Sequence, residues 1–235
     1  MQGMPTAADF TNSRVTNPGQ SEIIKQSLYD FQIYPGAGSQ QLSFFQAPVG
    51  QSFTSALGAT ATTAKSLWDT NMALGGQLSS GAQFLVDSIE VIFYPGSVST
   101  ANTFTVDTLT FFLGVASAVP TAQIDDVSAF YQSGLLEFNV LAKNYLREAP
   151  LARFPPKSYI TPYGAIATNS ATTAEVGYAA AHCEGRPYYL EPRVLLQPAM
   201  AFEILLRWPG LVPMTSGFNA RVGVVMDGYQ MRASQ

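Results

Sequence analysis

The stretch at residues 202–210, FEILLRWPG, is typical of a strand that lies half in a protein core. Its apolar side chains recur at every second position, the period of a β-strand with one buried face; they are Phe202, Ile204, Leu206 and Trp208. SIEVIFYPG (88–96) and DFQIYPG (30–36) also end in an aromatic residue followed by Pro-Gly. Pro lacks an N–H and Gly tolerates a positive φ, so we interpret the three endings as turns that terminate strands, with the aromatic residue capping the core. An aromatic platform for a ligand is the alternative interpretation.

From residue 31 onward, short apolar or alternating runs are separated by clusters of Gly, Pro, Ser, Thr and Asn. This pattern predicts an all-β sandwich or barrel, and the lack of long helical patterns argues against a parallel βαβ architecture. Only IDDVSAFYQSG (124–134) favours a short helix. The predicted strands are Gln41–Gln46, Phe84–Tyr94, Thr103–Val115, Gly134–Leu141, Tyr188–Leu196, Ala201–Trp208 and Ala220–Tyr229, with shorter ones at Gln51–Leu57 and Tyr159–Ile166.

The last predicted strand lies in ARVGVVMDGYQMRA (220–233). Its alternation places Val222, Val224 and Met226 on one face, and we expect that face to pack in the core against the apolar face of 202–208. Three connections, 58–82, 116–133 and 167–187, are long and rich in Ala, Ser, Thr and Gly. Loops of this length in a compact domain are usually functional or lie against a partner.

The amino-terminal residues differ from the remainder. Residues 1–20 have no periodicity, so we predict a flexible arm at 1–30 followed by one β-domain at 31–235. SEIIKQSLYDF (21–31) fits either a short amphipathic helix capped by Ser21 or an irregular strand. On the helix, one apolar face would contact a partner in assembly; it consists of Ile23, Ile24, Leu28 and Phe31.

The composition is weakly charged. Charged residues make up 12% of the chain and apolar residues 47%, with a formal net charge of −4. Ordinary soluble domains carry about twice that charged fraction, so we expect other subunits to cover much of the surface. A negative net charge argues against a surface that neutralises phosphates. The single cysteine, Cys183, excludes an internal disulfide, and no signal peptide is visible at the amino terminus.

No residue pattern predicts catalysis, a metal site or a cofactor. His182 is the only histidine and is followed directly by Cys183, whereas a catalytic pair or a cupin metal site needs groups that converge through the fold. The candidate ligand carboxylates are Asp107, Asp125, Asp126 and Glu137, and none has the spacing of a calcium loop. The basic residues Lys143, Arg147, Arg153 and Lys157 cluster, which solvated strand ends or a subunit contact explain. We therefore do not expect an enzyme.

Two longer stretches resemble a known family. YYLEPRVLLQPAMAFEILLRWPG (188–210) followed by ARVGVVMDGYQMRA (220–233) resembles the closing strands of the jelly-roll capsid proteins of icosahedral phages and viruses. SGLLEFNVLAKNYLREAPLARFPP (133–156) is similar to segments of capsid proteins from tailless phages. The resemblance implies a jelly roll, with two four-stranded antiparallel sheets, whose copies assemble side by side into a shell. A double jelly roll is the alternative, but about sixteen strands with very short loops would have to fit in this chain, so the long loops favour a single one.

The expected function is that of a structural virion protein, made in the host cytoplasm and located in the capsid. Its expected partners are copies of itself, other capsid proteins and, through the arm, an internal membrane. We do not expect direct nucleic-acid binding, because residues 1–30 carry two basic and three acidic side chains. The alternative is a carbohydrate-binding or receptor-binding β-sandwich with Tyr94, Trp208 or Tyr229 as stacking platforms.

Overall fold

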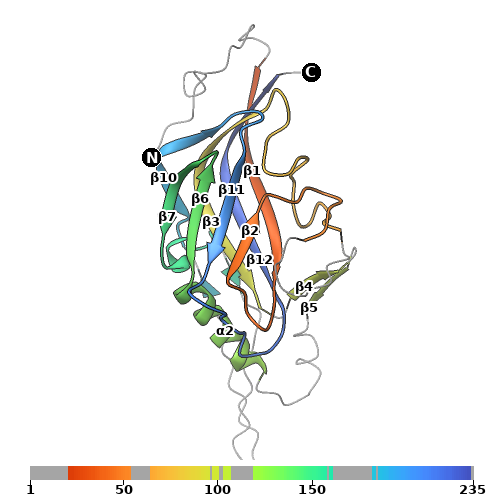
Figure 1. Cartoon of the computed structure of the whole chain (residues 1–235), viewed down its shortest axis with the longest axis vertical. Coiled ribbons are helices and arrows are strands. Elements are labelled where there is room, and N and C mark those ends of the chain that lie inside the picture. The colour runs from red at the N-terminus through yellow and green to blue at the C-terminus, as the bar shows by residue number, and fades with distance from the viewer. Residues whose placement is uncertain are drawn as a thin grey trace, which may run out of the picture.

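The computed structural model describes residues 21–53, 64–95, 97–100, 103–106, 119–157, 159–160, 182–183 and 185–233. They form two four-stranded antiparallel sheets packed as a sandwich (Figure 1). The expected all-β sandwich with two four-stranded sheets is confirmed. No helix within these ranges is long and apolar enough to cross a membrane.

The strand order of one sheet is β1-β12-β3-β10 and that of the other is β2-β11-β6-β7. The first sheet comprises β1 (Ser21–Tyr34), β12 (Ala220–Ala233), β3 (Gln83–Tyr94) and β10 (Tyr188–Leu196). The second comprises β2 (Gln41–Phe44), β11 (Phe202–Arg207), β6 (Leu135–Val140) and β7 (Lys143–Glu148). Smaller elements are the pairs β4 (Ser97–Thr100) with β5 (Thr103–Val106) and β8 (Tyr159–Ile160) with β9 (His182–Cys183), the helix α2 (Val119–Ser133) and the 3-10 turn η3 (Leu151–Arg153).

The sequence did not predict β7, because its residues KNYLRE are mostly exposed and lack an apolar alternation. The predicted strand Thr103–Val115 is described only as β5, and residues 107–115 lie outside the described ranges. The same holds for residues 54–57 and 161–166 of the two shorter predicted strands. The predicted helix at 124–134 is part of the longer α2, which covers one end of the sandwich (Figure 1).

The amino-terminal segment is a strand and not a helix. Residues 21–34 form β1, which pairs with β12 along its whole length, from Ser21 opposite Ala233 to Tyr34 opposite Ala220. The helix expected at 21–31 is therefore wrong, and residues 21–30 belong to the sandwich and not to an arm. Pairing with β12 satisfies the backbone groups along one side of this segment, and packing in the sandwich adds stability that a short isolated helix lacks.

Both carboxy-terminal strands supply the interior. All seven residues expected in the core are buried and belong to one apolar cluster; they are Phe202, Ile204, Leu206, Trp208, Val222, Val224 and Met226. The alternation of β11 and β12 therefore has the register that the sequence predicted. Between Asp227 and Gly228, β12 shifts register against β3, so the Asp-Gly pair of the last strand lies at a β-bulge.

Aromatic side chains close the core beneath α2. The Tyr34 ring meets the Trp208 ring edge-on with centroids 5.0 Å apart, and Phe93 stacks on Phe130 of α2 at 4.2 Å. Tyr34 and Trp208 each precede a Pro-Gly pair, so these two aromatic residues cap the core, as expected. Tyr94, which precedes the third pair, is only half-buried, and its neighbour Phe93 occupies the core position.

The buried Tyr34 phenol should make the stability of the fold depend on pH. Burial raises its pKa from 10.0 to about 12, and its hydroxyl donates to the Val212 carbonyl at 2.7 Å. The folded chain then holds this proton more tightly than the unfolded chain does, so its stabilising contribution is complete below pH 10 and declines as pH rises towards 12. Urea unfolding of the wild type and Tyr34→Phe should show a stability difference that shrinks over this interval. A difference independent of pH would contradict the assignment.

Candidate functional site

A loop covers the free edge of β1, and we call residues 64–76 the edge loop. The Phe31 N–H donates to the Asp69 carbonyl at 2.7 Å, and the Asn71 N–H donates to the Tyr29 carbonyl at 3.3 Å. The Tyr29 N–H in turn donates to the Asn71 side chain at 3.0 Å. Since β1 is the outermost strand of its sheet, these bonds occupy donors and acceptors that would otherwise be open to pairing with another chain.

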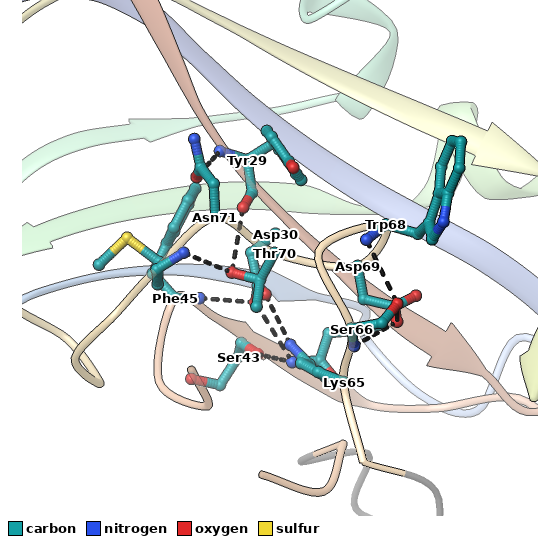
Figure 2. Close-up of polar contacts among 12 residues, drawn as sticks. Tyr29, Asp30, Ser43, Phe45, Lys65, Ser66, Trp68, Asp69, Thr70 and Asn71 are labelled. Carbon is teal, nitrogen blue, oxygen red and sulfur yellow. Dashed lines mark hydrogen bonds and ion pairs between the residues drawn. The ribbon is translucent and has the colours of Figure 1, made fainter. Parts of the chain in front are cut away.

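A buried ion pair fastens the start of the edge loop. The Lys65 Nζ lies 2.6 Å from Asp30 Oδ1, and both side chains are 0% exposed (Figure 2). Asp30 shares the inward face of β1 with Leu28, and its second oxygen accepts the Phe45 N–H at 2.8 Å. Desolvation by burial raises the pKa of Asp30 and lowers the pKa of Lys65, while each partner's charge opposes that shift. The pair therefore joins the loop to the interior of the sandwich at a high desolvation cost.

A second set of contacts fixes the tip of the loop. Asp69 Oδ2 accepts from the N–H and the hydroxyl of Ser66, both at 2.9 Å, and Asp69 Oδ1 lies 3.3 Å from the Arg221 guanidinium. Arg221 also donates to the Trp68 carbonyl and lies over the Phe31 ring, 3.8 Å from its centroid. Strands β1 and β12 thus both hold the backbone of the tip.

The fixed tip exposes two large apolar side chains. Trp68 is 82% exposed and Leu67 is 68% exposed. Figure 2 shows the Trp68 ring pointing away from the polar contacts that hold its backbone. Exposed tryptophan is uncommon and is enriched at binding hot spots, and a preformed backbone lowers the entropy cost of binding. The arrangement is suited to contact with another protein.

A cavity of about 320 Å³ lies between β7 and β10, each the outermost strand of its sheet. Its lining includes Tyr145, Tyr188 and Tyr189 together with Glu191 and Arg193. The edge loop covers β1, the outermost strand at the opposite side of the sandwich (Figure 1). The edge loop and this cavity therefore lie at opposite edges of the sandwich.

The four residues expected on one face of an assembly helix are divided by β1. Leu28 lies in the core cluster, and Phe31 is buried on the opposite face beneath Arg221. Ile24 is half-buried on the face of Leu28, and Ile23 is exposed on the face of Phe31. The common apolar face predicted for them is wrong, because alternate residues of a strand point to opposite sides.

The structure describes three of the four carboxylates considered as ligands, and two of these three have structural partners. Asp126 of α2 is buried and accepts from the Ser216 side chain and from the backbone N–H groups of Thr215 and Ser216. Glu137 pairs with Arg147 at 2.9 Å and with Arg207 at 3.4 Å. Asp125 is exposed, and Asp107 lies outside the described residues.

Three of the four clustered basic residues also have local partners. Arg147 pairs with Glu137, Arg153 with Glu148, and Lys157 with Asp227. Lys143 is exposed at the start of β7. His182 and Cys183 are consecutive residues of β9, paired with Ile160 and Tyr159.

The proposed stacking platforms are not open aromatic surfaces. Trp208 is buried in the core, and Tyr94 and Tyr229 are half-buried. Arg193 also lies over the Tyr229 ring, 5.9 Å from its centroid. A platform at Trp208 is therefore wrong, and the exposed aromatics among the described residues are elsewhere, at Trp68, Tyr145, Tyr189 and Phe218.

The sequence prediction missed Asp30, Lys65 and Trp68. One signal was present, since Lys65 is the only basic residue between Lys25 and Lys143. A fully buried lysine needs a specific partner, but the sequence alone does not show that Lys65 is buried. Its partner could not be found without the fold, because Asp30 and Lys65 meet only when the edge loop returns to β1.

Comparisons with known proteins identified no relative of this chain. No protein-family model, curated protein or solved structure matches this chain.

Removal of the Lys65 charge tests the role of the buried pair. Lys65→Met leaves Asp30 in the interior without its cation and should lower the free energy of unfolding by about 3–5 kcal/mol. The matched control Lys143→Met removes an exposed lysine of β7 and should change it by less than about 0.5 kcal/mol. Urea unfolding at neutral pH measures both. Equal and small effects of the two substitutions would show that the buried pair is not needed for stability.

Proposed function

We propose that this chain is a structural shell protein that assembles side by side into an icosahedral virus particle. The observation that carries the proposal is the exposed, rigidly held Trp68 at one edge of the sandwich, opposite an aromatic cavity at the other edge. A contact between two different edges is heterologous, and repetition of such a contact closes a ring when the rotation between neighbours is a whole fraction of a turn. Rings around symmetry axes are the units from which icosahedral shells are built.

The strand pairing supports the capsid assignment. Numbered along the chain, the eight sandwich strands pair first with last, second with seventh, third with sixth, and fourth with fifth. We infer a jelly roll from this order, the architecture of many viral capsid subunits. Lectin domains and cupins also use it, so the fold alone does not identify the function. The surface of the molecule has to distinguish between these functions.

The surface favours protein contacts over nucleic acid. The net charge is −4, and Arg147, Arg153 and Lys157 already pair with carboxylates of this chain. Genome binding would need unpaired cations that displace counterions from phosphates. Copies of the same chain, with other shell proteins, are the partners that this surface fits. The proposed location is the capsid.

A carbohydrate-binding module is the second candidate. The cavity combines Tyr145, Tyr188 and Tyr189 with Glu191 and Arg193, and sugar sites combine aromatic faces with a few polar groups in this way. In the shell proposal the same cavity receives the edge loop of a neighbouring subunit. The two functions therefore differ in what fills the cavity.

Substitution of Trp68 tests the shell proposal. Trp68→Ala should raise the subunit concentration needed for assembly by at least about tenfold, because a hot-spot tryptophan contributes about 2 kcal/mol or more. Its free energy of unfolding should change little, since the side chain is 82% exposed. Light scattering and negative-stain microscopy measure assembly across concentrations. Tyr189→Ala, at the opposite edge, should have a similar effect.

Leu211→Ala is the matched control, because Leu211 is also apolar and 53% exposed but lies in the connection from β11 to β12, outside the edge loop and the cavity lining. It should assemble as the wild type does. Wild-type chain that remains monomeric under all assembly conditions would contradict the shell proposal. Glycan-array binding that Tyr189→Ala abolishes, by such a monomer, would instead establish the carbohydrate-binding function.

A further inference from the structure

The buried contact between Asp30 and Lys65 places an amine against a carboxyl group. The Nζ atom is 2.6 Å from Oδ1, and no part of either side chain is exposed (Figure 2). The ammonium also lies 5.4 Å from the centre of the Phe53 ring. A nucleophile and an electrophile held in contact without bulk water have a large advantage in effective concentration.

The second oxygen of Asp30 has hydrogen-bond donors suited to a developing negative charge. Asp30 Oδ2 accepts the Phe45 backbone N–H at 2.8 Å and faces the Gln32 amide nitrogen at 3.4 Å. The Gln32 amide also donates to the Ser43 carbonyl at 2.9 Å, which fixes its orientation. Preorganised donors of this kind stabilise the oxyanion of an acyl-transfer intermediate.

Burial shifts both groups towards their uncharged forms. Desolvation by burial raises the pKa of the Asp30 carboxyl and lowers the pKa of the Lys65 amine. The other charges that act on Lys65 are Asp69, which opposes that lowering, and Arg221, which adds to it. Transfer of one proton from the ammonium to the carboxylate gives a neutral amine with a free lone pair and a neutral carboxylic acid, the two reactants of amide formation.

From this geometry we infer that Asp30 and Lys65 condense in the folded chain to form an intramolecular isopeptide bond. The Nζ lone pair attacks Asp30 Cγ, and the new C–N bond moves one electron pair onto Oδ2, where the Phe45 N–H and the Gln32 amide stabilise it. Protons from Nζ pass to Oδ1. The C=O bond to Oδ2 re-forms as Oδ1 leaves, so the products are one amide and one water molecule, and no oxidant, reductant or cofactor takes part.

Burial also protects the product. The amide is uncharged, so its formation removes two charges from the interior of the sandwich, whose desolvation is costly. The released water leaves as the site opens locally, and the closed site then keeps bulk water away from the amide, which opposes its hydrolysis. The bond would join β1 covalently to the edge loop and make that attachment permanent. This inference concerns one chain and does not depend on the proposed shell function.

The mass of the intact chain tests the inference. Electrospray mass spectrometry of the purified, folded full-length protein, denatured only for the measurement, should give a mass lower than that of the sequence by one water molecule. Chymotryptic digestion should release a branched peptide that joins the segment containing Asp30 to the segment containing Lys65. Trypsin should fail to cleave after Lys65, because an acylated lysine is not a substrate. The full sequence mass in folded protein would overturn the inference.

Two controls locate the bond. Lys65→Arg keeps the positive charge but lacks the nucleophilic amine, so this variant should show the full sequence mass. A water deficit that persists in Lys65→Arg would assign the loss to another site and overturn the inference. Lys157 and Asp227 form an ion pair in which Lys157 is half-exposed, and no branched peptide should join them. If Lys65→Arg does not fold, the presence or absence of the branched peptide in the wild type decides the question.

Discussion

A carboxylate on the inner face of β1 constrains the structure around it. Asp30 lies between the two sheets, where an unpaired charge would be costly, and its neighbours supply an ammonium from Lys65 and a backbone N–H from Phe45. Lys65 can reach Asp30 only if the edge loop returns to β1 after leaving β2. The same return places Asp69 and Asn71 against the backbone of β1. One buried charge thus determines how the edge of the sheet is covered.

The covered edge and the cavity edge give the sandwich two different sides. At β1, Arg221 and Tyr29 hold the carbonyls of Trp68 and Leu67, so the apolar side chains project from a fixed backbone. At β7 and β10, tyrosines surround a cavity. A molecule with unlike edges is suited to repeated contacts in one direction. The basic residues Arg147 and Arg153 are already paired with carboxylates of the same chain.

The sequence predicted the sandwich because its signal was local. Alternation in 202–208 and 220–229 and the breaks at Pro-Gly depend on the residues themselves, and they gave the correct core faces for β11 and β12. The prediction for residues 21–31 was wrong because SEIIKQSLYDF fits the period of a helix as well as that of a strand. Only the pairing with β12 decides between the two. The contact of Asp30 with Lys65 was beyond prediction, because it joins residues 35 positions apart in sequence through a fold-dependent return.

Amide hydrogen exchange in the native state tests most directly whether the buried contact holds the edge loop to the sandwich. The account predicts that the amides of Asp69, Thr70 and Asn71, which hydrogen-bond to Ser66 and to β1, exchange as slowly as those of β1 itself. Rapid exchange of these three amides, at the rate of an open loop while β1 and β12 remain protected, would contradict it. In that case Trp68 would not be held in place, and Asp30 with Lys65 would not determine how the edge of the sheet is covered.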